Sequence, residues 1–108
     1  MKRAKALAVA LDEALAGLRE LGALRVVLFG SFARGDIDVD SDLDLLVVMP
    51  DSKSGHDWTR LVYDRVPRNV AVDFLVYARD EWERELPRNS FLRHIETHGR
   101  VVYEKTAP

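Results

Sequence analysis

Residues 42–49, DLDLLVVM, limit what this chain can fold into more than any other segment. The last five residues of this run are all apolar, and successive side chains of a strand point to opposite faces of a sheet. A strand of this kind needs cover on both faces. We therefore expect it to lie centrally in a sheet that is flanked by helices.

The remaining elements follow from hydrophobic spacing and from glycine and proline stops. A helix that stops at Gly22 is predicted from leucines at helical spacing, and Ser31 is expected to cap a short helical turn closed by Gly35. Further strands are expected at 24–29, 69–77 and 100–104, and further helices at 56–66, 79–86 (stopped by Pro87) and 88–99. The fold class is α/β, with a mixed sheet of about four strands flanked by about four helices, in a single domain over residues 1–108.

Composition excludes several classes of protein. The 108 residues include no cysteine, so disulfides and thiolate metal sites are excluded. A net charge of −2 argues against a sequence-independent surface for duplex nucleic acid, which is usually strongly basic. Asp12 and Glu13 interrupt the apolar N-terminal run, and no stretch approaches the ~20 apolar residues that span a bilayer. We expect a cytoplasmic protein without a membrane partner.

Five aspartates alternate along the chain, at positions 36, 38, 40, 42 and 44. If Asp36 opened a calcium loop of the EF-hand type, the sixth position would be Ser41 instead of glycine, and the twelfth would be Val47 instead of glutamate. A strand also follows where a helix would be required. The calcium interpretation is therefore disfavoured.

The strand interpretation assigns the chemistry to two of the five aspartates. Asp42 and Asp44 share one face at the start of the buried strand. Ionising two neighbouring carboxylates is costly without a cation, and magnesium is the divalent ion that best suits oxygen ligands. Asp36, Asp38 and Asp40 precede the strand and are expected to be solvated; nothing in the sequence decides whether they have a further role.

A third carboxylate stands in the apolar run NVAVDFLVY. Val70, Val72, Phe74 and Val76 share one face of this strand, and Asp73 lies on the other face. Burying a carboxylate without a partner costs on the order of several kcal/mol of folding free energy. We expect Asp73 to have a metal, an arginine partner or a place at the open end of the sheet.

Gly30 and Ser31 lie between an expected strand and an expected helix start. Glycine lets the backbone approach a ligand closely, and free amide groups at a helix start, with the serine hydroxyl, suit a phosphate. Alone, this pair is usually only a turn. Beside paired aspartates on the next strand, it suggests phosphoryl or nucleotidyl transfer.

The pattern Gly30-Ser31, ten residues, then Asp42-x-Asp44 resembles the signature of the DNA polymerase beta-type nucleotidyltransferase superfamily. Over residues 24–77 the chain is similar to the minimal, single-domain branch. The resemblance implies that Gly30 and Ser31 bind the β- and γ-phosphates of a nucleoside triphosphate, with ATP as the expected substrate, and that Asp42, Asp44 and Asp73 hold two Mg²⁺ ions. Arg34 would pair with a phosphate or with an acid, and Phe32, where many relatives carry a cation, would pack under the loop.

The resemblance also implies a partner, because larger relatives carry a helical domain for base and acceptor that is not seen here. Minimal members resemble antitoxins of a small helical HEPN-type protein, and the implied reaction is AMP transfer onto a tyrosine of that toxin. A homo- or hetero-oligomer is also expected. The alternative is a binding module that inhibits a toxin by contact without catalysis.

Several other residues could bind a metal or stack on a base, but we expect them to have structural roles or to be solvated. His94 and His98 are four residues apart, as in some zinc sites, but have no third ligand nearby in sequence. Trp58 and Trp82 are expected to pack in the core instead of stacking on a base. Lys53, in the loop after the aspartate strand, is expected to be solvated.

Overall fold

The computed structural model describes residues 2–35, 43–67 and 70–105, and in that part of the chain four strands form one sheet. The strands are β1 (Arg25–Phe29), β2 (Leu43–Met49), β3 (Val72–Ala78) and β4 (Arg100–Glu104). The helices are α1 (Lys2–Leu21), α2 (Ser31–Arg34), α3 (Gly55–Arg65), α4 (Arg79–Glu85) and α5 (Ser90–His98), with a 3₁₀ turn η1 (Leu86–Arg88) after α4. The predicted α/β class and mixed sheet are confirmed.

The strand order is β3-β2-β1-β4, so β2 lies inside the sheet as expected. β1 pairs antiparallel with both β2 and β4, whereas β2 and β3 are parallel. A parallel pair needs a crossover connection, which α3 supplies. Every residue of β2 except Asp44 is buried, which confirms that this strand is covered on both faces.

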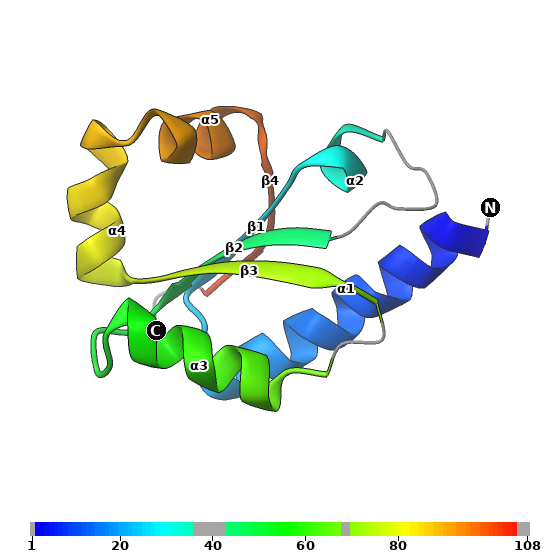
Figure 1. Cartoon of the computed structure of the whole chain (residues 1–108), viewed down its shortest axis with the longest axis horizontal. Helices are drawn as coiled ribbons and strands as arrows, with labels where there is room; N and C mark the ends of the chain where they lie inside the picture. Colours follow the sequence, from blue (N-terminus) through cyan, green and yellow to red (C-terminus); the bar gives the residue numbers. More distant parts are fainter. Residues whose placement is uncertain (1, 36–42, 68–69, 106–108) are drawn as a thin grey trace.

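Helices cover the two faces of the sheet. Figure 1 shows α1 and α3 below the strands and α4 and α5 above them. The larger apolar core lies on the side of α1 and α3 and includes Leu7, Leu18, Leu28, Leu45, Val62 and Phe74. A smaller core of Val27, Leu46, Leu92 and Ile95 fixes α5 on the opposite face. Because side chains alternate along each strand, Asp44 and Asp73 belong to this second face.

Several helix boundaries differ from the predicted ones. Ser31 is the first residue of α2, and Gly30 takes the capping position without a side-chain hydrogen bond. Pro87 does not stop a helix at residue 86; α4 ends at Glu85, and Pro87 lies inside η1, where its missing N–H costs little. The start of α5 is capped by Asn89, whose Oδ1 accepts hydrogen bonds from the backbone N–H groups of Phe91 and Leu92 at 3.0 and 3.1 Å.

Both tryptophans pack against the apolar cores, as predicted. Trp58 is 5% exposed, and its Nε1 donates a hydrogen bond to the carbonyl of Pro50 at 2.8 Å. Trp82 packs against the smaller core, and the guanidinium of Arg25 lies 5.5 Å from the centre of its ring. Trp58 is therefore a core residue, and Trp82 is a partly buried one at the edge of the smaller core.

None of the helices in the described ranges is long and apolar enough to cross a membrane.

Tyr77, on β3 beside α4, gives the fold a dependence on alkaline pH. Burial raises the pKa of Tyr77 above its ordinary value of 10.0, and the nearby Glu85 and Glu81 carboxylates raise it further. The unfolded chain therefore loses this proton first as the pH rises, and the unfolding free energy should fall above pH 10. Absorbance at 295 nm should show a tyrosine that ionises above pH 10 in the folded protein. The Tyr77→Phe variant should lack that step; an unchanged titration curve would contradict the assignment.

Candidate active site

Asp44 and Asp73 are direct partners across the two parallel strands. In the β2–β3 register the Cα atom of Asp44 lies opposite that of Asp73. Neighbouring strands are about 4.8 Å apart, so the two carboxylates leave the same face of the sheet side by side. Phe29 is the partner of Asp44 on β1. The site therefore lies at the end of the sheet where β1 ends and where β2 and β3 begin.

The environment of Asp73 differs from the one predicted. It was expected to be a buried carboxylate, but its side chain is exposed. The reason is its position: Asp73 is the second residue of β3, an edge strand, while α4 follows the other end of that strand. Within the described ranges no arginine pairs with Asp73. A place at the open end of the sheet, one of the three explanations considered from the sequence, is observed.

Gly30 brings the backbone against the Asp44 carboxylate. Its φ is +80°, and a Cβ atom added there would lie 2.2 Å from Oδ2 of Asp44. A side chain at this position would force the Asp44 carboxylate to move. Gly35, at the other end of α2, has a similar φ of +82° but nothing within 4 Å of the corresponding position. Only the first of these two glycines is needed for the approach of a carboxylate.

The short helix α2 is anchored beside this carboxylate. Phe32 and Ala33 pack against the larger core, which confirms the predicted packing of Phe32. The N–H of Arg34 donates to the carbonyl of Gly30 at 3.2 Å, closing one helical turn. Gly30 and Ser31 therefore lie at the start of α2 next to Asp44, as the predicted phosphate site requires, and Arg34 is exposed on the same turn.

Asp42, together with Asp36, Asp38 and Asp40, lies outside the described residues. In the part of the chain that is described, no group of three histidine, cysteine, aspartate or glutamate side chains could hold a metal ion. The described pair is nevertheless suited to one. Two carboxylates opposite each other repel, and oxygen ligands of this kind match a hard divalent cation such as Mg²⁺.

The structure adds one residue to the neighbourhood of Asp44 that sequence reasoning did not single out. Phe29 is both the register partner of Asp44 and the residue before Gly30. Its place as the last residue of a strand before Gly-Ser was a usable signal, but its antiparallel pairing with Asp44 depends on the sheet topology.

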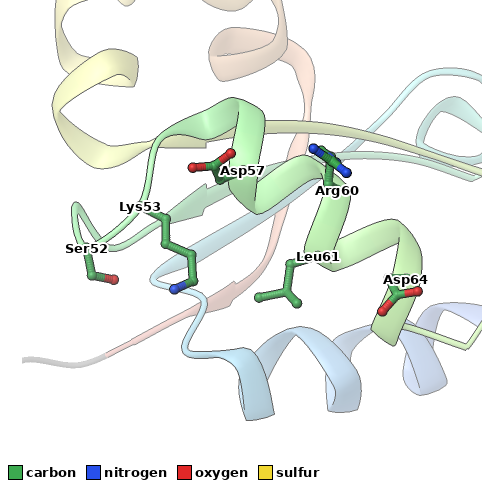
Figure 2. A pocket seen from close by; sticks show the side chains of 6 residues that line it. All are labelled: Ser52, Lys53, Asp57, Arg60, Leu61 and Asp64. Carbon is green, nitrogen blue, oxygen red and sulfur yellow. The ribbon is translucent and has the colours of Figure 1, made fainter.

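Lys53 lies away from this site. It follows β2, whose length from Asp44 to Met49 is about 17 Å at ~3.3 Å per residue. Its Nζ is 5.5 Å from the centre of the Trp58 ring. A hollow of about 730 Å³ lies between the β2–α3 loop and α3, and Lys53 lines it together with Ser52, Asp57, Arg60, Leu61 and Asp64. Figure 2 shows these six side chains. This hollow contains none of the candidate site residues.

Comparison with known proteins identifies the family. The model of the nucleotidyltransferase domain family matches residues 11–102. This chain belongs to that family. The match includes the Gly30–Ser31 element and both Asp44 and Asp73, so the chemistry of the protein is nucleotidyl transfer, and it is an enzyme of that class.

Two curated relatives come from Methanocaldococcus jannaschii. "Putative protein adenylyltransferase MJ0141" is 25% identical over 75 residues, which are 69% of this chain and 74% of that relative. "Putative protein adenylyltransferase MJ0604" is 30% identical over 84 residues, 73% of this chain and 77% of that relative. A crystal structure of a "putative nucleotidyltransferase" from Sulfolobus solfataricus has the same fold, with a TM-score of 0.57 and 22% identity over 96% of this chain and 82% of that one.

Replacing Gly30 tests the contact between the α2 start and Asp44. Both Gly30→Ala and Gly35→Ala place a side chain at positive φ, which costs about 1–2 kcal/mol of unfolding free energy. Only Gly30→Ala also displaces the Asp44 carboxylate. We expect similar losses of stability in denaturant titrations, together with a loss of nucleotidyl transfer that is confined to Gly30→Ala. Equal activity of the two variants would contradict the proposed role of Gly30.

Proposed function

We propose that this nucleotidyltransferase transfers AMP from ATP to a hydroxyl group of a partner protein. The observation that carries the proposal is the register of Asp44 with Asp73 beside Gly30, because it sets two carboxylates next to a close backbone approach. The names of the two relatives support a protein as the acceptor. A protein acceptor also suits Asp73, whose exposed carboxylate a partner's side chain can approach from solvent.

Asp42, Asp44 and Asp73 would hold Mg²⁺ in this proposal. The carboxylate donors fit that ion, and two Mg²⁺ ions would neutralise charge on the phosphates and lower the pKa of the acceptor hydroxyl. Without a cation, Asp44 and Asp73 would repel both each other and the triphosphate. The ion therefore makes the site suitable for an anionic substrate.

The residues of the chain then have distinct tasks. Backbone N–H groups at Gly30 and Ser31, with the Ser31 hydroxyl, hold the β- and γ-phosphates, and Arg34 adds positive charge on the same turn. The acceptor oxygen attacks the α-phosphorus and forms the new P–O bond. The bond from the α-phosphorus to the bridging oxygen breaks, and pyrophosphate leaves. Asp73 accepts the hydroxyl proton and can pass it to solvent, because its side chain is exposed.

The proposed partner is a small helical protein of the HEPN type, modified in the cytoplasm as the toxin of a toxin–antitoxin pair. The resemblance described above and the protein acceptors in the names of the relatives support it. A partner of this kind supplies the acceptor hydroxyl and frames it against the open end of the sheet. The nucleotidyl transfer itself does not depend on this identification.

Substitution of single carboxylates tests the proposed site. Asp44→Asn and Asp73→Asn keep the side-chain shape but remove charge, and each should lower the transfer rate by about two orders of magnitude or more. Asp64→Asn is the matched control, since Asp64 is an exposed aspartate on α3 whose side chain is 77% exposed. The measurement is Mg²⁺-dependent transfer of label from α-labelled ATP to the protein encoded by the adjacent gene. Undiminished labelling by both Asp44→Asn and Asp73→Asn would exclude this site.

The same experiment separates catalysis from inhibition by contact. Chelation of Mg²⁺ should abolish labelling, and readdition should restore it. If the Asp44→Asn protein neutralised the partner fully while no nucleotide labelled any band, the chain would act as a stoichiometric inhibitor, and the proposed transfer would be wrong.

A further inference from the structure

A cavity of about 240 Å³ lies between α2, the end of β1 and α5. Its walls include Gly30 and Arg34 on one side and Phe29, Phe91, His94 and His98 on the other. Pockets that enclose a whole drug-sized ligand are usually about 300–1,000 Å³. This one has room for one flat ring system, and four of its lining side chains are themselves planar rings.

The rings on α5 form one stripe along the helix. Phe91, His94 and His98 are spaced i, i+3 and i+7 and therefore share a face. The ring centres of His94 and His98 are 4.5 Å apart, and Phe91 meets Phe29 edge to face at 5.9 Å. Leu92 and Ile95 hold the helix on the sheet through the smaller core. The aromatic stripe is therefore held in place by the packing of α5 on the sheet.

Phe91 is unusually exposed for a large apolar side chain. Its exposed fraction is 53%, although its neighbour Leu92 is completely buried. An exposed aromatic side chain at the mouth of a cavity leaves apolar area in water that a ligand can cover. In the described ranges only Val9 and Val101 are comparable large apolar residues, and neither lines this cavity.

The cavity adjoins the candidate active site at α2, where Gly30 and Arg34 line both. Gly30 lines the cavity, and the Asp44 carboxylate packs against that same glycine. A nucleotide whose phosphates lie at Gly30 and Asp44 can thus reach the cavity with its ring system. Phenylalanine and histidine rings and arginine guanidinium groups are the surfaces on which bases stack in proteins.

We propose that Phe91, His94 and His98 form the nucleobase platform of this enzyme. The inference rests on the proposed function, because it assigns the base of the same nucleotide whose phosphates lie at Gly30. Phe91 supplies stacking, and the imidazoles supply both stacking and a donor or acceptor at the edge of the base. The platform lies on α5, beside the proposed phosphate site at Gly30.

The NMR signals of the histidine rings show directly whether the cavity is occupied. The chain has three histidines, and His56 lies on α3, against the opposite face of the sheet. In NMR spectra of the wild-type protein with Mg²⁺, addition of AMP should shift the ring signals of His94 and His98 and leave those of His56 unchanged. Inorganic tripolyphosphate should shift them little. Absence of any AMP-dependent shift at His94 and His98 would overturn the platform, whether or not labelling is observed.

Phe91 variants measure the stacking. Phe91→Ala should weaken ATP binding about tenfold, as expected for the loss of one base–aromatic contact, and should leave tripolyphosphate binding unchanged. Phe91→Trp should retain ATP affinity. The control is Val9→Ala, which truncates a residue of similar exposure, 55%, on α1. Equal losses for ATP and tripolyphosphate would assign the cavity to phosphate and overturn the inference.

The same titrations show whether the cavity binds the base or the ring of an acceptor tyrosine. They also separate the base platform from the transfer reaction. If N-acetyl-tyrosinamide shifts His94 and His98 while AMP does not, the cavity holds an acceptor side chain and the base platform is wrong. If labelling persists with an unchanged KM for ATP in Phe91→Ala, the platform fails and nucleotidyl transfer stands. If AMP shifts the histidines while no acceptor is labelled, the platform stands and the proposed transfer to a protein fails.

Discussion

The repulsion between Asp44 and Asp73 is the constraint on which the rest of the site depends. The parallel register of β2 and β3 makes the two carboxylates direct neighbours, and like charges in such positions destabilise a sheet. Water relieves part of this cost at the open end of the sheet, and a divalent cation would relieve more. A fold that keeps this pair therefore favours binding of a cation at that end.

The burial of β2 fixes the face of the sheet on which the Asp44 and Asp73 carboxylates lie. A slip of β2 by one residue would turn the Asp44 carboxylate toward the larger apolar core, where a charged group without a partner is costly. Asp44 is thereby held on the face of α4 and α5, and Gly30 brings the start of α2 against it. The core and the site are thus specified by the same few residues of β1 and β2.

The elements of the fold could be predicted from hydrophobic spacing, and β2 was placed centrally because its run of apolar residues leaves no face for water. The pairing of Asp44 with Asp73 needed the parallel register, which no local pattern contains. The exposure of Asp73 was missed because an apolar run looks alike in an edge strand and in a central one. The aromatic stripe of Phe91, His94 and His98 was missed too, since which face of α5 stays in water depends on the tertiary packing.

The most direct test of the account is the position of a divalent cation at the Asp44–Asp73 pair. Crystals grown with Mn²⁺ and a non-hydrolysable ATP analogue would locate the ion by its anomalous scattering. The account predicts a peak coordinated by oxygens of both Asp44 and Asp73, with the analogue's phosphates beside Gly30. A fully bound analogue without a peak there, or with its only ion held by other residues, would contradict it.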